Sequence, residues 1–272
     1  MPHYICETCG TQYDATPHPP EACPICQDER QYVGWDGQRW TTLDALRATH
    51  TIRMADDAGL LGLDVSPAFA IHQRALLLPT DAGNILWECL SLVTDEAVAA
   101  LQAQGGVQRI IISHPHFYSS MVAWSEALGG VPILLHAADR EWVQRDSPRI
   151  QYWQGDTLTL SSDVTLLRCG GHFAGSTALH WRGAAGRSSA LFPGDALQVA
   201  ADRRHVAFMY SYPNHIPMRA ADVLYMQQLL RDFEFDNVYG FSRGRNIIGG
   251  GRAAVDRSMQ RFLATTVAPV AV

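Results

Sequence analysis

Lysine is absent from this chain of 272 residues, and all 21 of its basic residues are arginines. Without an ε-ammonium group the protein can form neither a lysine Schiff base nor the P-loop that holds nucleotide phosphates. Acidic residues number 27, so the formal net charge is −6. Proteins that bind nucleic acids in general are usually basic, so we expect no nucleic-acid partner.

Long apolar runs are also absent. The longest ones, such as residues 74–79, are far shorter than the roughly 20 residues that a helix needs to cross a bilayer. The N-terminal residues 1–6 have neither the basic region nor the apolar core of a secretory signal. We therefore expect a cytoplasmic protein that has no membrane partner.

The few cysteines are unevenly spaced. Four of the six form two Cys-x-x-Cys pairs, Cys6 with Cys9 and Cys23 with Cys26. Without a secretory signal, such pairs indicate metal ligands rather than disulfides. Four thiolates can surround one tetrahedral ion, and the pattern resembles the knuckles of rubredoxin and the zinc ribbons. Zinc and iron both accept four thiolates, so zinc is expected and iron stays an alternative.

The first 67 residues are interpreted as a small module and a linker. A segment of about forty residues buries too little surface to fold alone, so the metal is expected to stabilise residues 1–40. An iron centre that transfers electrons is the alternative. Thr41 or Thr42 can cap a short helix with Asp44 in its first turn. The rest of 41–67 has no clear period and is interpreted as a linker that packs on the main domain, residues 68–272.

Alternating strand and helix patterns characterise the main domain and predict an α/β architecture. A hairpin is expected over 69–78 and 85–90, with its turn at 80–84. The further predicted strands are 109–112, 131–135, 157–160, 164–168, 178–181, 190–192 and 237–239. The predicted helices are 95–104, 119–128, 137–144, 217–232 and 252–264.

Three short motifs carry the candidate chemistry. His114 and His116 follow the strand 109–112, and their spacing lets one loop present two imidazoles to one ion. Cys169-Gly-Gly-His172 supplies a third histidine in a loop whose glycines permit sharp turns. The strand 190–192 ends in Pro-Gly-Asp195, which offers a carboxylate.

These motifs, in this order, resemble those of the metallo-β-lactamase-fold hydrolases, a superfamily that includes hydroxyacylglutathione hydrolases, lactonases and the diiron domain of flavodiiron proteins. The resemblance covers residues 68 to about 250. It implies a four-layer αββα sandwich with a metal site at one edge of the two sheets, preceded here by the small four-cysteine ribbon. It also implies that His114, His116 and His172 hold one metal and that Asp195 contacts it.

The chain departs from the family pattern His-x-His-x-Asp-His. Tyr118 occupies the Asp place and Ser119 the place of the last His, and the C-terminal stretch 238–244 has no histidine. These are the ligands that belong only to a second metal. The resemblance therefore implies a mononuclear zinc, iron or manganese site. Arg243 would place a positive charge near the missing ion and hold an anionic substrate group. Tyr118 would donate a hydrogen bond or ligate.

The expected function is hydrolysis of a small-molecule ester, thioester or lactone. The metal would activate a water molecule, and Asp195 would orient that water or accept its proton. Substrate specificity is expected to lie in the loops 205–217 and 240–250. Two alternatives stay open: a redox protein fed by a rubredoxin-like iron centre, and a binding protein of the same fold without catalysis.

Overall fold

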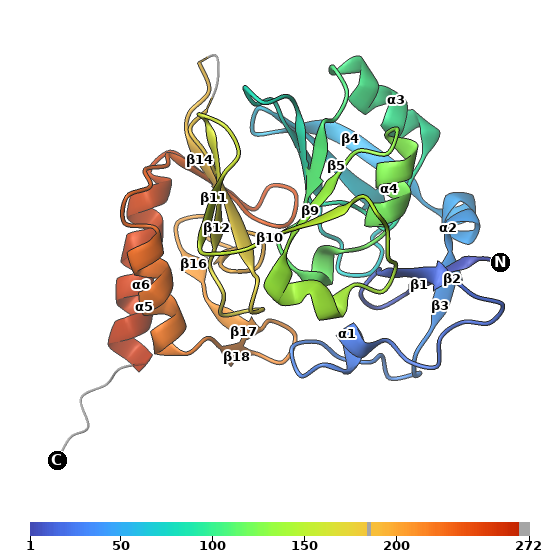
Figure 1. The fold of residues 1–272 in the computed structure, drawn as a ribbon. Helices are drawn as coiled ribbons and strands as arrows, with labels where there is room; N and C mark the ends of the chain where they lie inside the picture. The colour runs from blue at the N-terminus through green and yellow to red at the C-terminus, as the bar shows by residue number, and fades with distance from the viewer. Residues whose placement is uncertain (184–185, 267–272) are drawn as a thin grey trace.

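The computed structural model describes residues 1–183 and 186–266. Two β-sheets pack face to face, and helices cover the outer face of each sheet (Figure 1). A small N-terminal sheet lies beside one edge of this sandwich. The architecture is the expected four-layer αββα sandwich. Within the described ranges, no helix combines the length and apolar character needed to cross a membrane.

The first sheet has the strand order β10-β9-β8-β7-β6-β5-β4. Its strands from β7 to β10 run parallel to one another, whereas β4 to β7 pair antiparallel. The strands are β4 (Thr51–Asp57), β5 (Leu60–Ser66), β6 (Ala75–Leu78), β7 (Ile85–Trp87), β8 (Arg109–Ile111), β9 (Ile133–His136) and β10 (Ile150–Trp153). The predicted hairpin is confirmed as β6 and β7.

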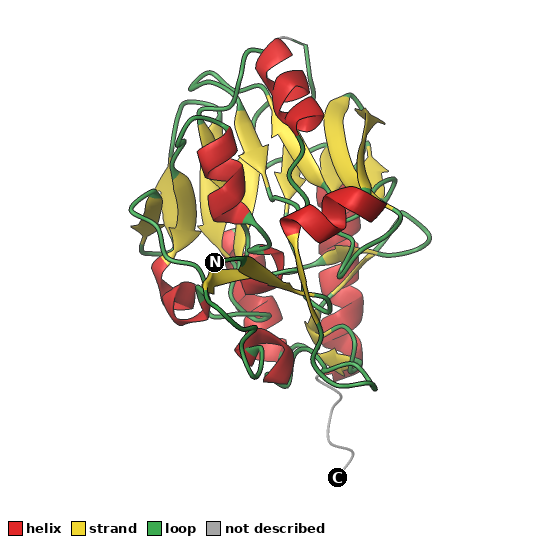
Figure 2. Ribbon diagram, turned by 90° about the vertical axis from the view of Figure 1, so that its right-hand side faces the viewer, coloured by secondary structure: helices red, strands yellow, loops and turns green. Residues whose placement is uncertain are grey.

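Helices α3 (Asp95–Ala103) and α4 (Met121–Ala127) cover the outer face of this sheet, as Figure 2 shows. The expected helix over 137–144 is the 3₁₀ segment η2 (Ala137–Trp142). The alternation of β9 explains the layering: Ile133 and Leu135 face the helices, whereas Leu134 faces the second sheet. Successive side chains of a strand point to opposite faces, so one strand serves both apolar layers.

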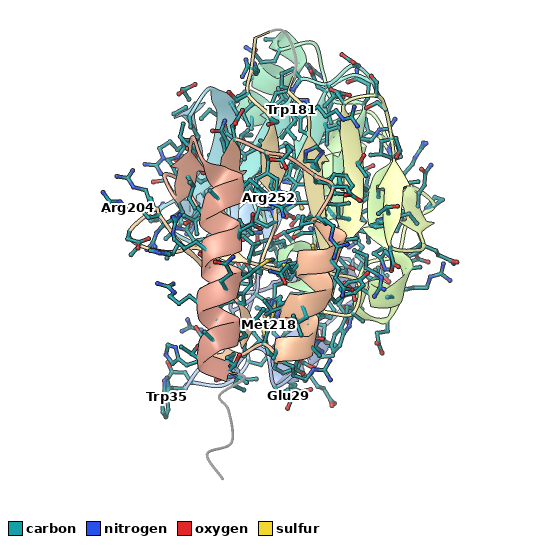
Figure 3. The ribbon with its side chains drawn as sticks, turned by 90° about the vertical axis from the view of Figure 1, so that its left-hand side faces the viewer. Glu29, Trp35, Trp181, Arg204, Met218 and Arg252 are labelled. Carbon is teal, nitrogen blue, oxygen red and sulfur yellow. The ribbon has the colours of Figure 1, made fainter. Side chains whose placement is uncertain are left out.

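The second sheet has the order β11-β12-β13-β14-β19-β20. Helices α5 (Ala220–Leu229) and α6 (Gly251–Thr266) cover its outer face (Figure 3). Large side chains from both sheets, such as Trp87 and Phe192, fill the layer between them. The strands are β11 (Thr157–Thr159), β12 (Val164–Arg168), β13 (Thr177–Trp181), β14 (Ala190–Phe192), β19 (Asn237–Tyr239) and β20 (Asn246–Ile248).

The interpretation of residues 51–66 as part of a linker was wrong, because β4 and β5 form the end of the first sheet. Strand β4 is an edge strand whose residues are mostly exposed, so its sequence carries little apolar signal. Its turn into β5 consists of Ala58 and Gly59, both with positive φ. Such hairpin turns usually contain Asn-Gly or Asp-Gly, so this one was not recognisable from the sequence.

The N-terminal module has the sheet order β2-β1-β3. Its elements are β1 (His3–Cys6), β2 (Gln12–Ala15), α1 (Pro24–Gln27) and β3 (Trp40–Thr42), followed by α2 (Leu43–Thr49). Thr42 caps α2, because its hydroxyl accepts a hydrogen bond from the Ala45 amide at 3.3 Å. The cap predicted at Thr41 or Thr42 is therefore confirmed.

Candidate metal centres

Three loops at one edge of the sandwich carry the residues of the main candidate site. His114 and His116 follow β8, with His116 inside the 3₁₀ turn η1 (Pro115–Phe117). His172 lies in the loop between β12 and β13. Asp195 follows β14 in the second sheet. Both sheets therefore contribute candidate ligands, and the two inner layers of the fold bring them to the same edge.

The four side chains converge, as the sequence predicted. One nitrogen from each histidine and one carboxylate oxygen of Asp195 lie within 4.8 Å of one another. His172 Nε2 is 3.1 Å from His116 Nδ1, and His114 Nε2 is 3.6 Å from Asp195 Oδ2. All four residues are buried. Such a set of three nitrogens and one oxygen suits zinc and related divalent ions.

Neighbouring groups contact the outer nitrogens of His114 and His172, and the one beside His172 fixes its tautomer. The His114 Nδ1 atom is 2.7 Å from the Ser113 hydroxyl, and the His172 Nδ1 atom is 2.8 Å from the Tyr210 carbonyl oxygen. A carbonyl only accepts, so His172 Nδ1 carries the proton and Nε2 keeps its lone pair. Buried His114 Nε2 has no hydrogen-bond partner among the described residues. An unpaired buried nitrogen at this position fits a metal ligand.

Burial determines the electrostatics of the cluster. Desolvation lowers the pKa of His114 and of His116 well below the ordinary value, and it lowers the pKa of His172 to about 4. The imidazoles are therefore neutral and able to ligate. Desolvation also raises the pKa of Asp195 to about 7, while a hydrogen bond from Gln198 at 2.8 Å opposes that shift. A bound cation would favour the ionised carboxylate.

A close approach between two loops places the carboxylate beside the histidines. Gly194 has a φ of +54° next to Asp195. A Cβ atom on Gly194 would overlap the Ser113 side chain, so a larger residue there would displace the residue before His114. Position 194 thus requires glycine for two reasons: the positive φ of the backbone and the lack of space for a Cβ atom.

The places of the second-metal ligands hold side chains with other partners. The Tyr118 hydroxyl is buried and lies 3.3 Å from the Asp139 carbonyl oxygen, to which it donates. The Ser119 hydroxyl accepts a hydrogen bond from Gln73 at 2.7 Å. Phe241, in the C-terminal stretch 238–244 that has no histidine, stacks on Phe117. Tyr118, Ser119 and Phe241 therefore lie outside the described cluster of His114, His116, His172 and Asp195.

The structure does not bring Arg243 to this cluster, contrary to the expectation of a substrate clamp. Its guanidinium pairs with Asp64 and donates to the Gly62 carbonyl at 2.9 Å. Asp64 is almost completely buried on β5, so its charge requires a cationic partner. The missed strand explains the error, because this partner of Arg243 lies in the segment that was interpreted as a linker.

A buried carboxyl was not foreseen from the sequence. Glu88, directly after β7, has a positive φ of 63° and accepts a hydrogen bond from the Ser113 amide at 3.2 Å. Burial raises the pKa of Glu88 to about 8, and the nearby Asp195 adds to that shift. Its position at the end of a buried strand was the available signal.

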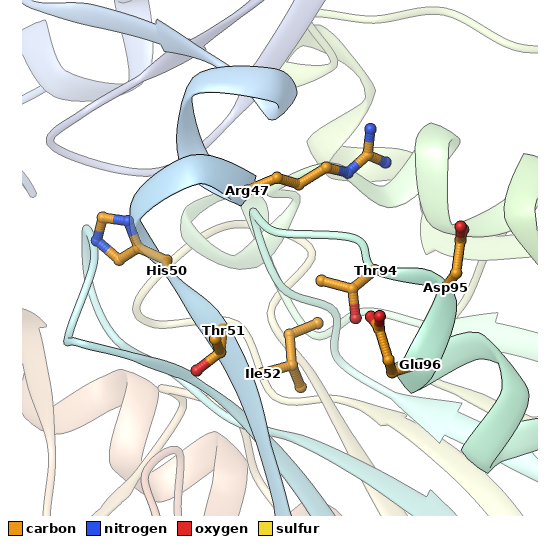
Figure 4. Close-up of a pocket in the computed structure, with 7 residues that line it drawn as sticks. All are labelled: Arg47, His50, Thr51, Ile52, Thr94, Asp95 and Glu96. Atoms are coloured by element: carbon orange, nitrogen blue, oxygen red, sulfur yellow. The ribbon is translucent and has the colours of Figure 1, made fainter.

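A cavity of about 510 Å³ opens onto the cluster and is lined by His116, His172 and Asp195. Tyr212 and Phe241 also line it, and they belong to the two loops that were expected to hold specificity residues. The N-terminal module adds Thr8, Gln31 and Tyr32, which the sequence did not indicate. A second cavity, of about 480 Å³ between α2 and α3, contains none of the predicted site residues (Figure 4).

The four-cysteine cluster forms as predicted. The Sγ atoms of Cys6 and Cys26 are 3.5 Å apart, and those of Cys9 and Cys23 are 3.6 Å apart. All four cysteines are buried, and none forms a disulfide. Hydrogen bonds with neighbouring thiols, chiefly that of Cys23, lower the pKa of Cys6. These separations and the sulfur-only donor set fit one tetrahedral metal ion.

Comparison with known proteins supports the fold. No protein-family model matches the chain. A Bacillus subtilis (strain 168) protein, described as the uncharacterized protein YmaE, is 40% identical over 266 residues, which are 97% of this chain and 96% of that protein. The solved structure of the DIM-1 metallo-β-lactamase is similar with a TM-score of 0.56 and 12% identity, over 80% of this chain and 98% of that one. A B3 metallo-β-lactamase with an active-site glutamic acid has a TM-score of 0.52 and 17% identity, over 76% and 87% of the two chains.

Proposed function

Because the chain belongs to the same family as the Bacillus subtilis protein YmaE and has the metallo-β-lactamase fold, we propose that it is a metal-dependent hydrolase. The observation that carries the proposal is the buried convergence of His114, His116, His172 and Asp195 beside an open cavity. These four residues would hold a metal ion, which would supply the chemistry of lowering the pKa of a water molecule and polarising a carbonyl group. The substrate class is a small ester, thioester or lactone.

The chain's own residues would organise the reaction around that ion. Gln198 donates to Asp195 Oδ1 and thereby fixes the carboxyl group, which leaves Oδ2 beside His114 Nε2. Asp195 Oδ2 would orient the attacking water or accept its proton as a general base. The Tyr210 carbonyl keeps the proton of His172 on Nδ1. Tyr118 would have a positioning role, because its hydroxyl donates a hydrogen bond to the backbone of η2 and so holds the loop after His116 against η2.

Two metal ions per chain follow from this proposal, one at each cluster. We propose zinc for both, because zinc accepts both a sulfur-only set and a set of imidazoles and a carboxylate. Mass spectrometry of protein purified without added metal would measure this. Iron in the four-cysteine cluster would instead favour the redox alternative.

The decisive variant is His116→Ala, assayed with zinc-loaded protein and 4-nitrophenyl esters. Removing a residue that only hydrogen-bonds to a metal ligand typically reduces activity by roughly 10–100-fold. Removing a ligand itself should reduce activity more, so we expect kcat/KM to fall by at least about a hundredfold. The exposed His18 provides the matched control, and His18→Ala should retain full activity. Unchanged hydrolysis in His116→Ala would refute the proposal.

A further inference from the structure

The N-terminal module adjoins the candidate metal centre through residues 28–32, which directly follow α1 and its ligand Cys26 (Figure 1). The side-chain amide of Asn214 donates to the carbonyl oxygens of Glu29 and Gln31, at 2.9 and 3.1 Å. The Ser211 hydroxyl donates to the Arg30 carbonyl at 3.0 Å. Hydrogen bonds thus attach this segment to the loop 209–214 of the main domain.

Arg30 connects the same segment to the loop of His172. Its guanidinium carbon is 3.9 Å from the ring centroid of Phe173, and its Nη1 atom donates to the His172 carbonyl at 3.2 Å. Asp28 pairs with Arg30 and neutralises its charge. Arg30 therefore contacts an aromatic ring, a carbonyl oxygen and a carboxylate, and its positive charge is compensated.

These contacts place Gln31 and Tyr32 in the wall of the cavity that opens onto the metal cluster. Gln31 is only 6% exposed, and its amide oxygen has no hydrogen-bond partner among the described residues. A buried amide oxygen without a partner in the wall of a cavity is able to accept a hydrogen bond from a ligand. Tyr32 is 50% exposed and lies beside it, so its ring is free to cover an apolar group.

The charges of the side chains that line the cavity limit which substrates can bind there. Of the described residues that line it, none is an arginine, and the only acidic one is the candidate ligand Asp195. Arg243, which was expected to bind an anionic group, is paired with Asp64. The other lining side chains are apolar or neutral, as in Ile71, Pro213 and Phe241. Away from the proposed metal ion, such a wall favours an uncharged group, because an anionic group there would lose its hydration without gaining a cationic side chain.

We propose that the four-cysteine module forms part of the substrate site of the main domain, and that Gln31 and Tyr32 determine its specificity. Gln31 bonds a polar group of the substrate, and Tyr32 covers its apolar part. The substrate is an uncharged ester or lactone with an apolar substituent. This inference rests on the proposed hydrolase function.

The kinetic test compares two esters with the same leaving group, neutral 4-nitrophenyl butyrate and anionic mono-4-nitrophenyl succinate. We expect about tenfold higher kcat/KM for the neutral ester. Tyr32→Ala should raise KM for the butyrate about tenfold with kcat nearly unchanged, because it removes uniform binding. Tyr32→Arg should shift the preference toward the succinate. A preference of the unmodified protein for the succinate would overturn the inference.

The matched control is Trp35→Ala. Trp35 is an aromatic residue of the same module, is fully exposed at 104%, and is labelled at the periphery of the molecule in Figure 3. It does not line the cavity, so both kinetic constants should keep their values. Equal effects of Tyr32→Ala and Trp35→Ala would contradict the specificity role.

A binding measurement separates this inference from the hydrolase proposal. Titration calorimetry of zinc-loaded protein would use benzohydroxamic acid, a neutral metal-binding probe, and its 4-carboxylate. We expect the neutral probe to bind about tenfold more tightly, and Tyr32→Ala but not Trp35→Ala to weaken it. If the neutral probe binds in this way but the protein hydrolyses no ester, only the hydrolase proposal would be refuted. Ester hydrolysis with KM unaffected by Tyr32→Ala would refute only the specificity inference.

Discussion

At the scale of single residues, Asp139 in η2 illustrates how burial alters a carboxyl group. Its Oδ1 atom accepts a hydrogen bond from the Gly175 amide at 2.7 Å, whereas Oδ2 has no partner among the described residues. Desolvation raises the pKa of Asp139 to about 7, although the Gly175 amide opposes the shift. The ionised form is therefore less stable in the folded protein than in the unfolded chain.

The variant Asp139→Asn tests this effect. Between about pH 4 and pH 7 the folded protein retains a proton that the unfolded chain has lost, so its stability falls as the pH rises. Asn does not titrate, and its amide oxygen can accept the same hydrogen bond. Denaturant unfolding should show the variant gaining stability relative to the unmodified protein over this range, with no further gain above it. The exposed Asp146→Asn is the control, and a pH-independent difference for Asp139→Asn would contradict the mechanism.

Residue types explain how much of the candidate site the sequence could predict. Only a few residue types carry an imidazole, a thiol or a carboxylate, and the spacing of these residues next to strand ends is visible in the sequence. The convergence of the four candidate ligands His114, His116, His172 and Asp195 was therefore predictable. Gln31 and Tyr32 were not, because neutral side chains occur throughout every surface and only their position in the cavity distinguishes them.

At the scale of elements, the close approach between the loop after β14 and the end of β8 determines the geometry of the site. Gly194→Ala combines a left-handed backbone with a clash against Ser113. We expect a loss of about 1–3 kcal/mol in the free energy of unfolding. The variant should also bind zinc more weakly, because Ser113 is hydrogen-bonded to His114.

The control for that variant is Gly129→Ala. Gly129 has a φ of +89° but no atom within 4 Å of an added Cβ. Its substitution should therefore cost only the backbone strain, about 1 kcal/mol, and leave zinc affinity unchanged. Chemical unfolding and zinc titration measure both quantities. Equal zinc affinities in the two variants would show that the close approach does not position His114.

Elements with a strong local signal were predicted, whereas edge elements were not. Helix α3 was expected over 95–104, and in the structure Thr94 caps it and two acidic residues follow in its first turn. Strand β4 was missed because one of its sides has no neighbouring strand, so its side chains need not be apolar. Strand β4 forms by pairing with β5, and the turn that joins the two strands lacks the Asn-Gly or Asp-Gly pair that usually marks a hairpin in the sequence.

At the scale of the whole molecule, the metal of the N-terminal module is expected to stabilise a segment with little core of its own. Besides the four cysteines, its buried cluster contains only Tyr13 and Ile25 among the residues that the structure describes. Cys26→Ser should reduce the metal content from two ions to one per chain and lower the thermal unfolding temperature. Mass spectrometry and calorimetry measure the two effects.

Cys89→Ser is the matched control, since Cys89 is buried but lies outside both clusters. It should retain both ions. A Cys26→Ser variant that also kept two ions would contradict the assignment of the four-cysteine cluster as a metal site.

The sequence by itself determined the periodic patterns of apolar residues in the strands and helices that form two sheets with outer helices. It also determined the spacing of the candidate cysteine and histidine ligands. These features are local, because they depend on the alternation of a strand and on short loops at strand ends. Only the tertiary structure decided that Arg243 pairs with Asp64 and that Gln31 and Tyr32 line the cavity. Such contacts join segments far apart in the chain, and they depend on which surfaces must be buried and which charges must be paired when the whole molecule packs.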